Sequence, residues 1–203
     1  MKKIIYASNN LGKYNELKSA LIKENVMIYH YKDLEPDLDV LIEEKGHTYE
    51  ENALIKAKTY AKVLNLPVVS DDGGLELIAF PELLGIHTQR MFEEGASDES
   101  KNQQILTLYN HLARSNVNRH ARLIAALAYA YPSGESIVVK EEVEFKIAKY
   151  SRGNKGYGFD SILYIPTLQK TVGELLDEQR HEYSPRVLAF KQLLKRIEES
   201  NEY

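Results

Sequence analysis

Apolar and polar positions along the first part of the chain predict a strand, a helix and a second strand. An apolar segment at 3–7 reads as a strand, and another at 26–31 reads as the strand that returns beside it. Between them, apolar residues recur at helical spacing, at Leu17, Ala20 and Leu21. The helix should start near Gly12 and Lys13. Together the three segments predict a βαβ unit.

The strongest helical pattern lies at 49–64. Its apolar stripe consists of Tyr49, Ala53, Ala57, Tyr60, Ala61 and Leu64. Thr48 followed by Glu51 predicts a capping box at the start of the helix, and Pro67 predicts its end. Three polar residues run along the edge of the stripe, where a side chain can reach a cleft: Asn52, Lys56 and Thr59.

A pair of aspartates follows this helix. Val68 and Val69 read as a short buried strand, and Asp71 and Asp72 come at its end, directly before two glycines. In open α/β sheets, ligands bind at the carboxyl ends of strands. Successive side chains of extended backbone point to opposite faces, so we expect only one carboxylate to face a cleft. A divalent cation would offset the repulsion between the pair. A solvated Asp-Asp-Gly-Gly turn is the alternative.

The second half of the chain predicts a mixture of helices and strands. Residues 97–99 favour a helix start, and the core stripe of that helix is Ile105, Leu108, Tyr109 and Leu112. Residues 121–148 read as an antiparallel hairpin with its turn at 132–134. Thr171 and Glu174 cap a short helix. Ser184 and Pro185 start the last helix, whose buried face is Val187, Phe190, Leu194 and Ile197.

Composition restricts the class of protein. The chain has 203 residues, of which 43% are hydrophobic and 28% charged, so it can form a sizeable core. We expect one domain over residues 1–203, or two lobes that share one sheet. A net charge of -4 argues against general nucleic-acid binding, and the absence of cysteine excludes disulfides and thiolate metal sites. With no signal peptide or membrane-spanning run, we expect a cytoplasmic protein.

Two loops carry candidate chemistry. The first, residues 8–13, has small polar residues, feeds a helix N-terminus and ends in Lys13. Free N–H groups and the helix dipole suit such a loop to an anion, although Ser and Asn also cap ordinary helices. The second, residues 152–160, is rich in glycine. Here Tyr157 could stack on a base, and Asp160 could accept a hydrogen bond from a ribose or hold the loop. An ordinary loop with an exposed tyrosine is the alternative.

Two further segments contain possible ligands. Glu43 and Glu44 precede the helix that carries Lys56 and could reach the same cleft as Asp72. Thr88 and Arg90 are possible pocket residues, and a surface role fits them equally well.

Several separated segments together resemble the inosine triphosphate pyrophosphatase family. They are ASNNLGK, TYEENALIKAK with SDDGGLEL, GIHTQR, GNKGYGFDSILYIP, KTVGEL and YSPRVLAFKQLL, in this order along nearly the whole chain. The resemblance implies an α/β fold, with an elongated mixed sheet flanked by helices and two lobes with a cleft between them. It also implies a homodimer, magnesium as cofactor, and hydrolysis of the deaminated purine nucleotides ITP, XTP and dITP to monophosphate and pyrophosphate.

The resemblance also implies roles for individual residues. Asp72 would be the proton acceptor, aided by Lys56 and Lys13, and Glu44 with Asp72 would bind the metal. The substrate-binding residues would be Ser8, Asn9, Asn10, Lys13, Gly73, Tyr157, Gly158, Phe159, Asp160, Arg180, Ser184 and Arg186.

The chain departs from the family pattern mainly where the base is read. Pro185 stands in place of a histidine, Arg180 in place of a lysine, and Ser161 in place of a proline. Asn9 and Gly73 replace a glycine and a serine. Two rival functions follow: a pyrophosphatase for a different modified nucleotide, and a nucleotide-binding module without turnover.

Overall fold

The computed structural model describes residues 2–22, 24, 26–85, 92–93, 95–112 and 117–200. Its strands are β1 (Lys2–Tyr6), β2 (Val26–His30), β3 (Val68–Leu77), β4 (His120–Ala130), β5 (Ser136–Ile147), β6 (Leu163–Ile165) and β7 (Lys170–Thr171). Its α-helices are α1 (Leu11–Ala20), α2 (Tyr49–Leu64), α3 (Asp98–Thr107), α4 (Asp177–Glu182) and α5 (Pro185–Ser200). Short helical turns follow three elements: η1 (Tyr31–Asp33), η3 (Leu108–Leu112) and η4 (Val172–Glu174).

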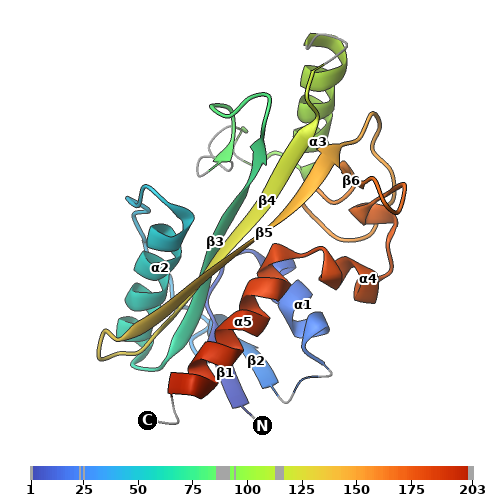
Figure 1. Cartoon of the computed structure of the whole chain (residues 1–203). Helices are drawn as coiled ribbons and strands as arrows, with labels where there is room; N and C mark the ends of the chain where they lie inside the picture. Colours follow the sequence, from blue (N-terminus) through green and yellow to red (C-terminus); the bar gives the residue numbers. More distant parts are fainter. Residues whose placement is uncertain are drawn as a thin grey trace. The chain divides into compact units, whose positions relative to one another are not determined.

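The strands form one seven-stranded mixed sheet in the order β2-β1-β3-β4-β5-β6-β7 (Figure 1). β1 pairs in parallel with both β2 and β3, and β6 is antiparallel to β5 and β7. The predicted βαβ unit is therefore confirmed as β1-α1-β2. The α/β class and the mixed sheet are confirmed as well.

The predicted hairpin at 121–148 is confirmed as β4 and β5. At its turn the Tyr131 N–H donates to the Glu135 carbonyl, and at its open end the Ile147 N–H donates to the Arg119 carbonyl. These two bonds are in one antiparallel register. Gly134 takes a positive φ of 99° in the turn, a conformation that suits a residue without Cβ.

The start of α2 differs from a full capping box. The Thr48 hydroxyl accepts from the Glu51 N–H at 3.1 Å, as predicted. The Glu51 carboxylate, however, accepts from the His47 N–H at 2.6 Å, one residue before the cap. The helix ends at Leu64, the last residue of the predicted stripe. Asn65, in the left-handed region with a φ of 52°, caps it two residues before Pro67.

The short strand predicted at Val68 and Val69 is in fact ten residues long. Gly73 and Gly74 lie inside β3, which runs on to Leu77. The aspartate pair is therefore in the middle of a strand, and both the strand end and the solvated-turn alternative are wrong. β3 pairs with β1 just before the aspartates, with Ile5 opposite Val68 and Tyr6 opposite Val69.

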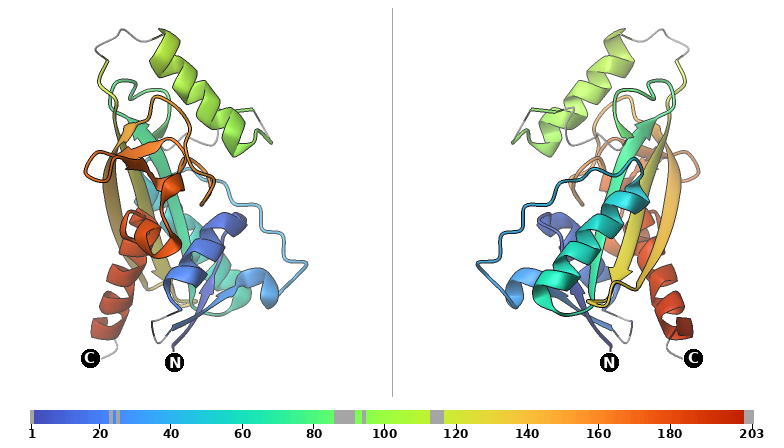
Figure 2. Two further views of the ribbon diagram at one scale, coloured as in Figure 1. Left: turned by 90° about the vertical axis from the view of Figure 1, so that its right-hand side faces the viewer. Right: turned by 90° about the vertical axis from the view of Figure 1, so that its left-hand side faces the viewer.

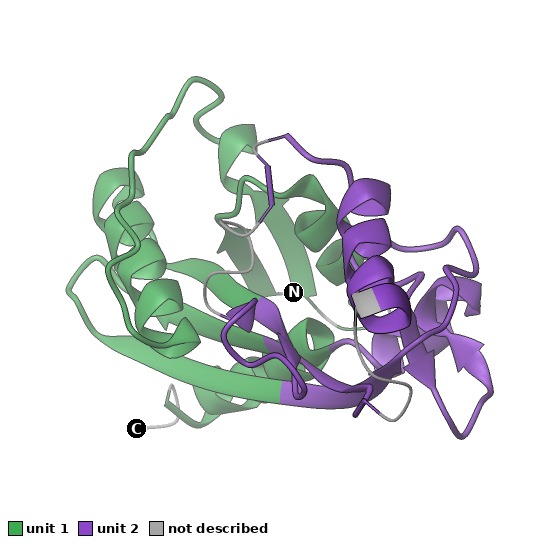
Figure 3. Ribbon diagram, turned by 90° about the horizontal axis from the view of Figure 1, so that it is seen from above, with its two compact units in different colours: residues 1–73, 125–141, 185–203 green, residues 74–124, 142–184 purple. Residues whose placement is uncertain are grey.

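The chain divides into two compact units (Figure 3). Unit 1 comprises residues 1–73, 125–141 and 185–203, and unit 2 comprises residues 74–124 and 142–184. Strands β3, β4 and β5 continue from one unit into the other.

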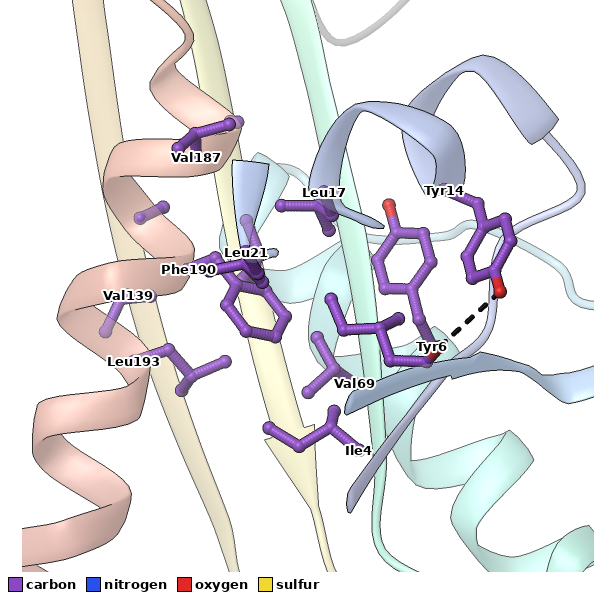
Figure 4. Close-up of a cluster of buried hydrophobic side chains, with 14 of the residues drawn as sticks. Ile4, Tyr6, Tyr14, Leu17, Leu21, Val69, Val139, Val187, Phe190 and Leu193 are labelled. Atoms are coloured by element: carbon purple, nitrogen blue, oxygen red, sulfur yellow. Dashed lines mark hydrogen bonds between the residues drawn. The ribbon is translucent and has the colours of Figure 1, made fainter. Parts of the chain in front are cut away.

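Each unit has its own apolar core. In unit 1, α1 and α5 pack on the strands, and Figure 4 shows the side chains of Tyr6, Leu17, Val69 and Phe190 gathered in this cluster. The core of unit 2 includes Leu75, Leu77, Ile105, Tyr109, Phe145, Ile147, Ile162 and Leu163. The predicted stripes account for most of these positions, because an amphipathic element buries its apolar face.

Candidate active site

Asp71 and Asp72 point to opposite faces of β3, as the alternation of strand side chains requires. Asp71 contacts Lys13 of α1 and Arg186 of α5, whereas Asp72 contacts Lys56 of α2. Within unit 1, α2 accordingly covers one face of the strands, and α1 and α5 cover the other (Figure 2). The two carboxylates therefore form direct contacts with different cations, although Lys56 also acts on Asp71 through its charge.

Asp71 is a buried carboxylate that is fully engaged. Its Oδ2 accepts from Lys13 Nζ at 2.8 Å and from Arg186 Nε at 3.0 Å, and its Oδ1 accepts from the Tyr6 hydroxyl at 2.5 Å. Burial alone would raise the pKa of Asp71, but the surrounding cations hold it well below its usual range. Asp71 therefore remains an anion that fixes Lys13 and Arg186.

Two more interactions complete this cluster. Arg186 Nη1 donates to Glu16 Oε2 at 2.7 Å, so its guanidinium lies between two carboxylates. Burial, together with the positive charges of Arg186 and Lys56, lowers the pKa of Lys13 in spite of the opposing Asp71 carboxylate. An anion close to Lys13 would offset this effect, because it favours the charged form of the lysine.

On the other face of β3, Asp72 and Glu44 share one ammonium group. Lys56 Nζ lies 3.0 Å from Asp72 Oδ1 and 3.2 Å from Glu44 Oε1. Asn52 donates to Asp72 Oδ2 at 3.3 Å and accepts from the Gly46 N–H at 2.9 Å, which ties the segment before α2 to the same cluster. The predicted convergence of Glu44, Lys56 and Asp72 is thus present.

The charges of this second cluster differ in character from those around Asp71. Burial, reinforced by Glu44, raises the pKa of Asp72 even though Lys56 lowers it. Burial would lower the pKa of Lys56, but the carboxylates of Asp72, Asp71 and Glu44 raise it overall. Asp72 is therefore the more basic of the two aspartates, and Lys56 stays an ammonium.

The first loop is closed by its own side chains. Asn10 is the N-cap of α1, and its Oδ1 accepts from the Lys13 N–H at 3.3 Å. Ser8 Oγ accepts from the Asn10 N–H at 3.3 Å, and Asn9 is exposed. The loop therefore places hydroxyl, amide and backbone N–H groups at the N-terminus of the helix that carries Lys13.

The remaining candidates lie in unit 2, around the glycine-rich loop. Asp160 Oδ2 accepts from the Tyr157 N–H at 3.2 Å and lies 3.9 Å from Arg180 Nη1. The Asp160 carboxylate therefore forms a hydrogen bond within its own loop. A Cβ on Gly156, which has a φ of 79°, would collide with the Asp160 carboxylate. The Gly158 N–H donates to Asp98 Oδ2 at 2.6 Å.

Two further candidates, Phe159 and Ser184, also lie in unit 2. The Phe159 ring lies 6.3 Å from the Phe92 ring, centroid to centroid, and Ser184 is buried directly before α5. Thr88 and Arg90 lie outside the described residues.

The Ham1 family model matches residues 4–196. The chain belongs to the Ham1 family. It is 38% identical over 186 residues to the dITP/XTP pyrophosphatase of Staphylococcus aureus strain MW2, covering 92% of this chain and 91% of that protein. It is 35% identical over 199 residues to the dITP/XTP pyrophosphatase of Bacillus subtilis strain 168, covering 98% of both.

Among solved structures, the Staphylococcus aureus Ham1 protein has a TM-score of 0.79 to this chain. The two are 36% identical, and the match covers 98% of this chain and 100% of that one. The family resemblance noted from the sequence is therefore confirmed, together with the α/β fold of the Ham1 family.

Two residues of the buried cluster were not among the candidates: Tyr6, which donates to Asp71, and Glu16, which accepts from Arg186. Asp71 was considered only as one of a pair. The period of two predicted that it faces away from Asp72, but it gave no signal for which side chains surround it. Thr59 was placed at a cleft edge, but its hydroxyl donates to the Ile55 carbonyl of its own helix.

Over the described ranges, no group of three or more His, Cys, Asp or Glu side chains is arranged to hold a metal ion. The same residues contain no helix long and apolar enough to cross a membrane.

Proposed function

We propose that the protein hydrolyses deaminated purine nucleoside triphosphates, dITP, XTP and ITP, to the monophosphate and pyrophosphate. The observation that carries this proposal is the cluster of Lys56, Asp72 and Glu44 in a member of the Ham1 family, whose relatives include dITP/XTP pyrophosphatases. When water attacks a phosphoanhydride, a basic carboxylate can accept the proton of the water, and an ammonium group can stabilise the negative charge that develops on the phosphate oxygens.

Binding of the polyanionic triphosphate is the first requirement. In this proposal the first loop, with Ser8, Asn9 and Asn10, donates hydrogen bonds to phosphate oxygens at the N-terminus of α1. Lys13 binds a further oxygen, and the bound anion compensates the positive charge that burial disfavours. Gly73, next to Asp72 in β3, leaves room for the substrate because it has no side chain.

A metal ion would be held by Glu44 and Asp72. Both carboxylates already converge on one cation, the Lys56 ammonium, so their geometry fits a second positive charge close by. Mg²⁺ is commonly bound by one or two carboxylates plus phosphate oxygens and keeps several waters, which matches a two-carboxylate set. When bound, magnesium neutralises phosphate charge and polarises the phosphorus that is attacked.

Asp72 would act as the general base that accepts the proton of the attacking water. The oxygen of a water molecule bonds to the α-phosphorus, its proton passes to Asp72, and the bond from the α-phosphorus to the pyrophosphate oxygen breaks. The raised pKa of Asp72 suits this role, because a more basic carboxylate is a better proton acceptor. Lys56 and Lys13 stabilise the charge that develops on the leaving pyrophosphate.

The nucleobase would be recognised by residues of unit 2. We propose that Tyr157 stacks on the base and that Gly158 and Phe159 shape the loop beneath it. Arg180 and Ser184 offer donors to the base, while Pro185 offers none. Asp160 contributes by holding the loop.

We further propose that the protein is a cytoplasmic homodimer in which residues 1–203 act as one domain.

The test is a substrate panel. Release of pyrophosphate is measured for dITP, XTP, ITP, modified pyrimidine triphosphates and the ordinary triphosphates, with Mg²⁺ and with a chelator. The proposal expects hydrolysis of the deaminated purines that requires Mg²⁺. Preferred hydrolysis of a triphosphate with another modified base would show that the substrate class is different. Thermal stabilisation by nucleotides without any product would show that the protein is a nucleotide-binding module and not an enzyme.

A further inference from the structure

His30, at the end of β2, and Tyr31, directly after it, form hydrogen bonds with the first loop, residues 8–13. His30 Nε2 lies 2.8 Å from the Ser8 carbonyl oxygen, and the Tyr31 hydroxyl donates to Asn9 Oδ1 at 2.5 Å. Both side chains are buried, with 6% and 1% of their surface exposed. The loop that would receive the phosphates is therefore supported by rigid, buried groups.

The short turn η1 fixes these side chains. His30 Nδ1 accepts from the Lys32 N–H at 3.3 Å, and the Asp33 carboxylate accepts from the His30 N–H at 3.1 Å. Because Nδ1 of a neutral imidazole is the acceptor here, the proton lies on Nε2, which donates to the Ser8 carbonyl. The backbone of the loop is thus held at Ser8.

The proton of the Tyr31 hydroxyl is committed to Asn9. Tyr60 of α2 packs against Tyr31, with ring centroids 4.8 Å apart and ring planes inclined at 53°. This contact holds the Tyr31 ring in place, and its hydroxyl donates to Asn9 Oδ1.

This bond orients the Asn9 carboxamide. An asparagine side chain has an acceptor oxygen on one side and two N–H donors on the other. With Oδ1 turned toward the Tyr31 hydroxyl, the NH₂ group faces away from the buried cluster, on a residue that is exposed. If the carboxamide were reversed, its oxygen would meet the phosphate and repel it.

We propose that Tyr31 is a positioning residue for substrate binding, which sets the Asn9 carboxamide so that its N–H groups donate to the triphosphate. This inference rests on the proposed function, because it concerns the same loop. It adds that the loop reads the anion through an asparagine side chain that a buried tyrosine holds in one of its two orientations.

The test removes one hydroxyl. Tyr31→Phe is expected to raise KM for dITP about tenfold, the size that follows from losing one hydrogen bond to a charged group, with little change in kcat. Tyr14→Phe is the matched control. It removes another hydroxyl of the same aromatic cluster, one that donates to the Ile28 carbonyl and not to the loop. That control should keep the wild-type KM.

A double variant shows whether Tyr31 acts through Asn9. Asn9→Ala should raise KM by a similar factor, and Tyr31→Phe should add nothing in the Asn9→Ala background. Additive effects, or equal KM values for Tyr31→Phe and Tyr14→Phe at unchanged melting temperature, would overturn the inference.

Calorimetric binding of inorganic tripolyphosphate separates this inference from the proposed function. A wild-type protein that releases no pyrophosphate from any triphosphate would overturn the proposed function alone. Weaker tripolyphosphate binding by Tyr31→Phe, with wild-type binding by Tyr14→Phe, would still support the role of Tyr31. Equal binding by both variants would count against it.

Discussion

Asp71 and Asp72 are adjacent in sequence and opposite in chemistry, because a strand turns them to different neighbours. Asp71 lies among Lys13, Arg186 and Tyr6, which stabilise its charge. Asp72 shares Lys56 with Glu44 and keeps a raised pKa. One carboxylate is thus suited to hold cations in place, and the other to accept a proton.

Replacing Asp72 tests the base. Asp72→Asn should lower kcat by about 10²–10⁴-fold, the usual contribution of a general base. The fold should be retained, because burial already disfavours the charge that is removed and Glu44 remains to pair Lys56. Pyrophosphate release and thermal melting are measured together. Near-normal turnover in Asp72→Asn would remove this residue from the proton-accepting role.

Replacing Asp71 should act on stability. Asp71→Asn leaves Lys13 and Arg186 facing each other without their shared carboxylate, a change that costs about 3–5 kcal/mol when a buried pair is broken. Because the pKa of Asp71 is lowered on folding, its contribution is present above the unfolded value of about 4 and is lost as pH falls toward the folded value.

Urea unfolding between neutral and acidic pH, with a chelator present, measures this contribution. The loss of stability on acidification should be smaller in Asp71→Asn than in the wild type. An equal slope in both would mean that other carboxylates account for the acid sensitivity.

The pKa of Asp72 depends on Lys56. In the metal-free protein this pKa lies above the ordinary aspartate value of about 3.9, because burial and Glu44 raise it more than Lys56 lowers it. Lys56→Met removes the neighbouring cation, so the pKa of Asp72 should rise further. NMR titration of the Asp72 side chain with a chelator present measures this pKa in both proteins, and an unchanged value in Lys56→Met would contradict the prediction.

At the scale of elements, sequence patterns located most segments but misplaced some of their ends. Helical stripes and the hairpin alternation were sufficient because burial of one face decides such elements. The length of β3 was missed because two consecutive glycines usually signal a turn, whereas Gly73 and Gly74 lie inside a strand. The convergence of Glu44, Lys56 and Asp72 was predicted, because Glu44 directly precedes the helix that carries Lys56, but the ion pairs among them depend on tertiary packing.

The end of α2 offers a test at this scale. Asn65 holds a left-handed conformation, with a φ of 52°, that costs most residues about 1 kcal/mol or more. Asn65→Ala should therefore destabilise the protein by about this amount, whereas Asn65→Gly should match or exceed the wild type. Chemical unfolding of the three proteins gives the comparison. Equal stability of the Ala and Gly variants would show that another feature ends the helix.

At the scale of the whole molecule, the sequence predicted the fold class and the family and left open one domain or two lobes that share one sheet. The structure divides the chain into two compact units, each with its own apolar core. Periodicity identifies which faces are buried, but it does not reveal which faces pack together, so one core and two cores look alike in the sequence. The strands β3, β4 and β5 belong to both units, which couples the two cores through continuous backbone.

Two matched truncations test whether the units unfold as one. Phe190 in the core of unit 1 and Phe145 in the core of unit 2 are both buried, so each change to alanine should cost about 3–5 kcal/mol. Since three strands run through both cores, we expect either variant to unfold in a single transition, with fluorescence and circular dichroism coincident. Two separated transitions in Phe145→Ala, with the second near the wild-type midpoint, would mean that unit 1 remains folded without unit 2. In that case residues 1–203 would not behave as one domain.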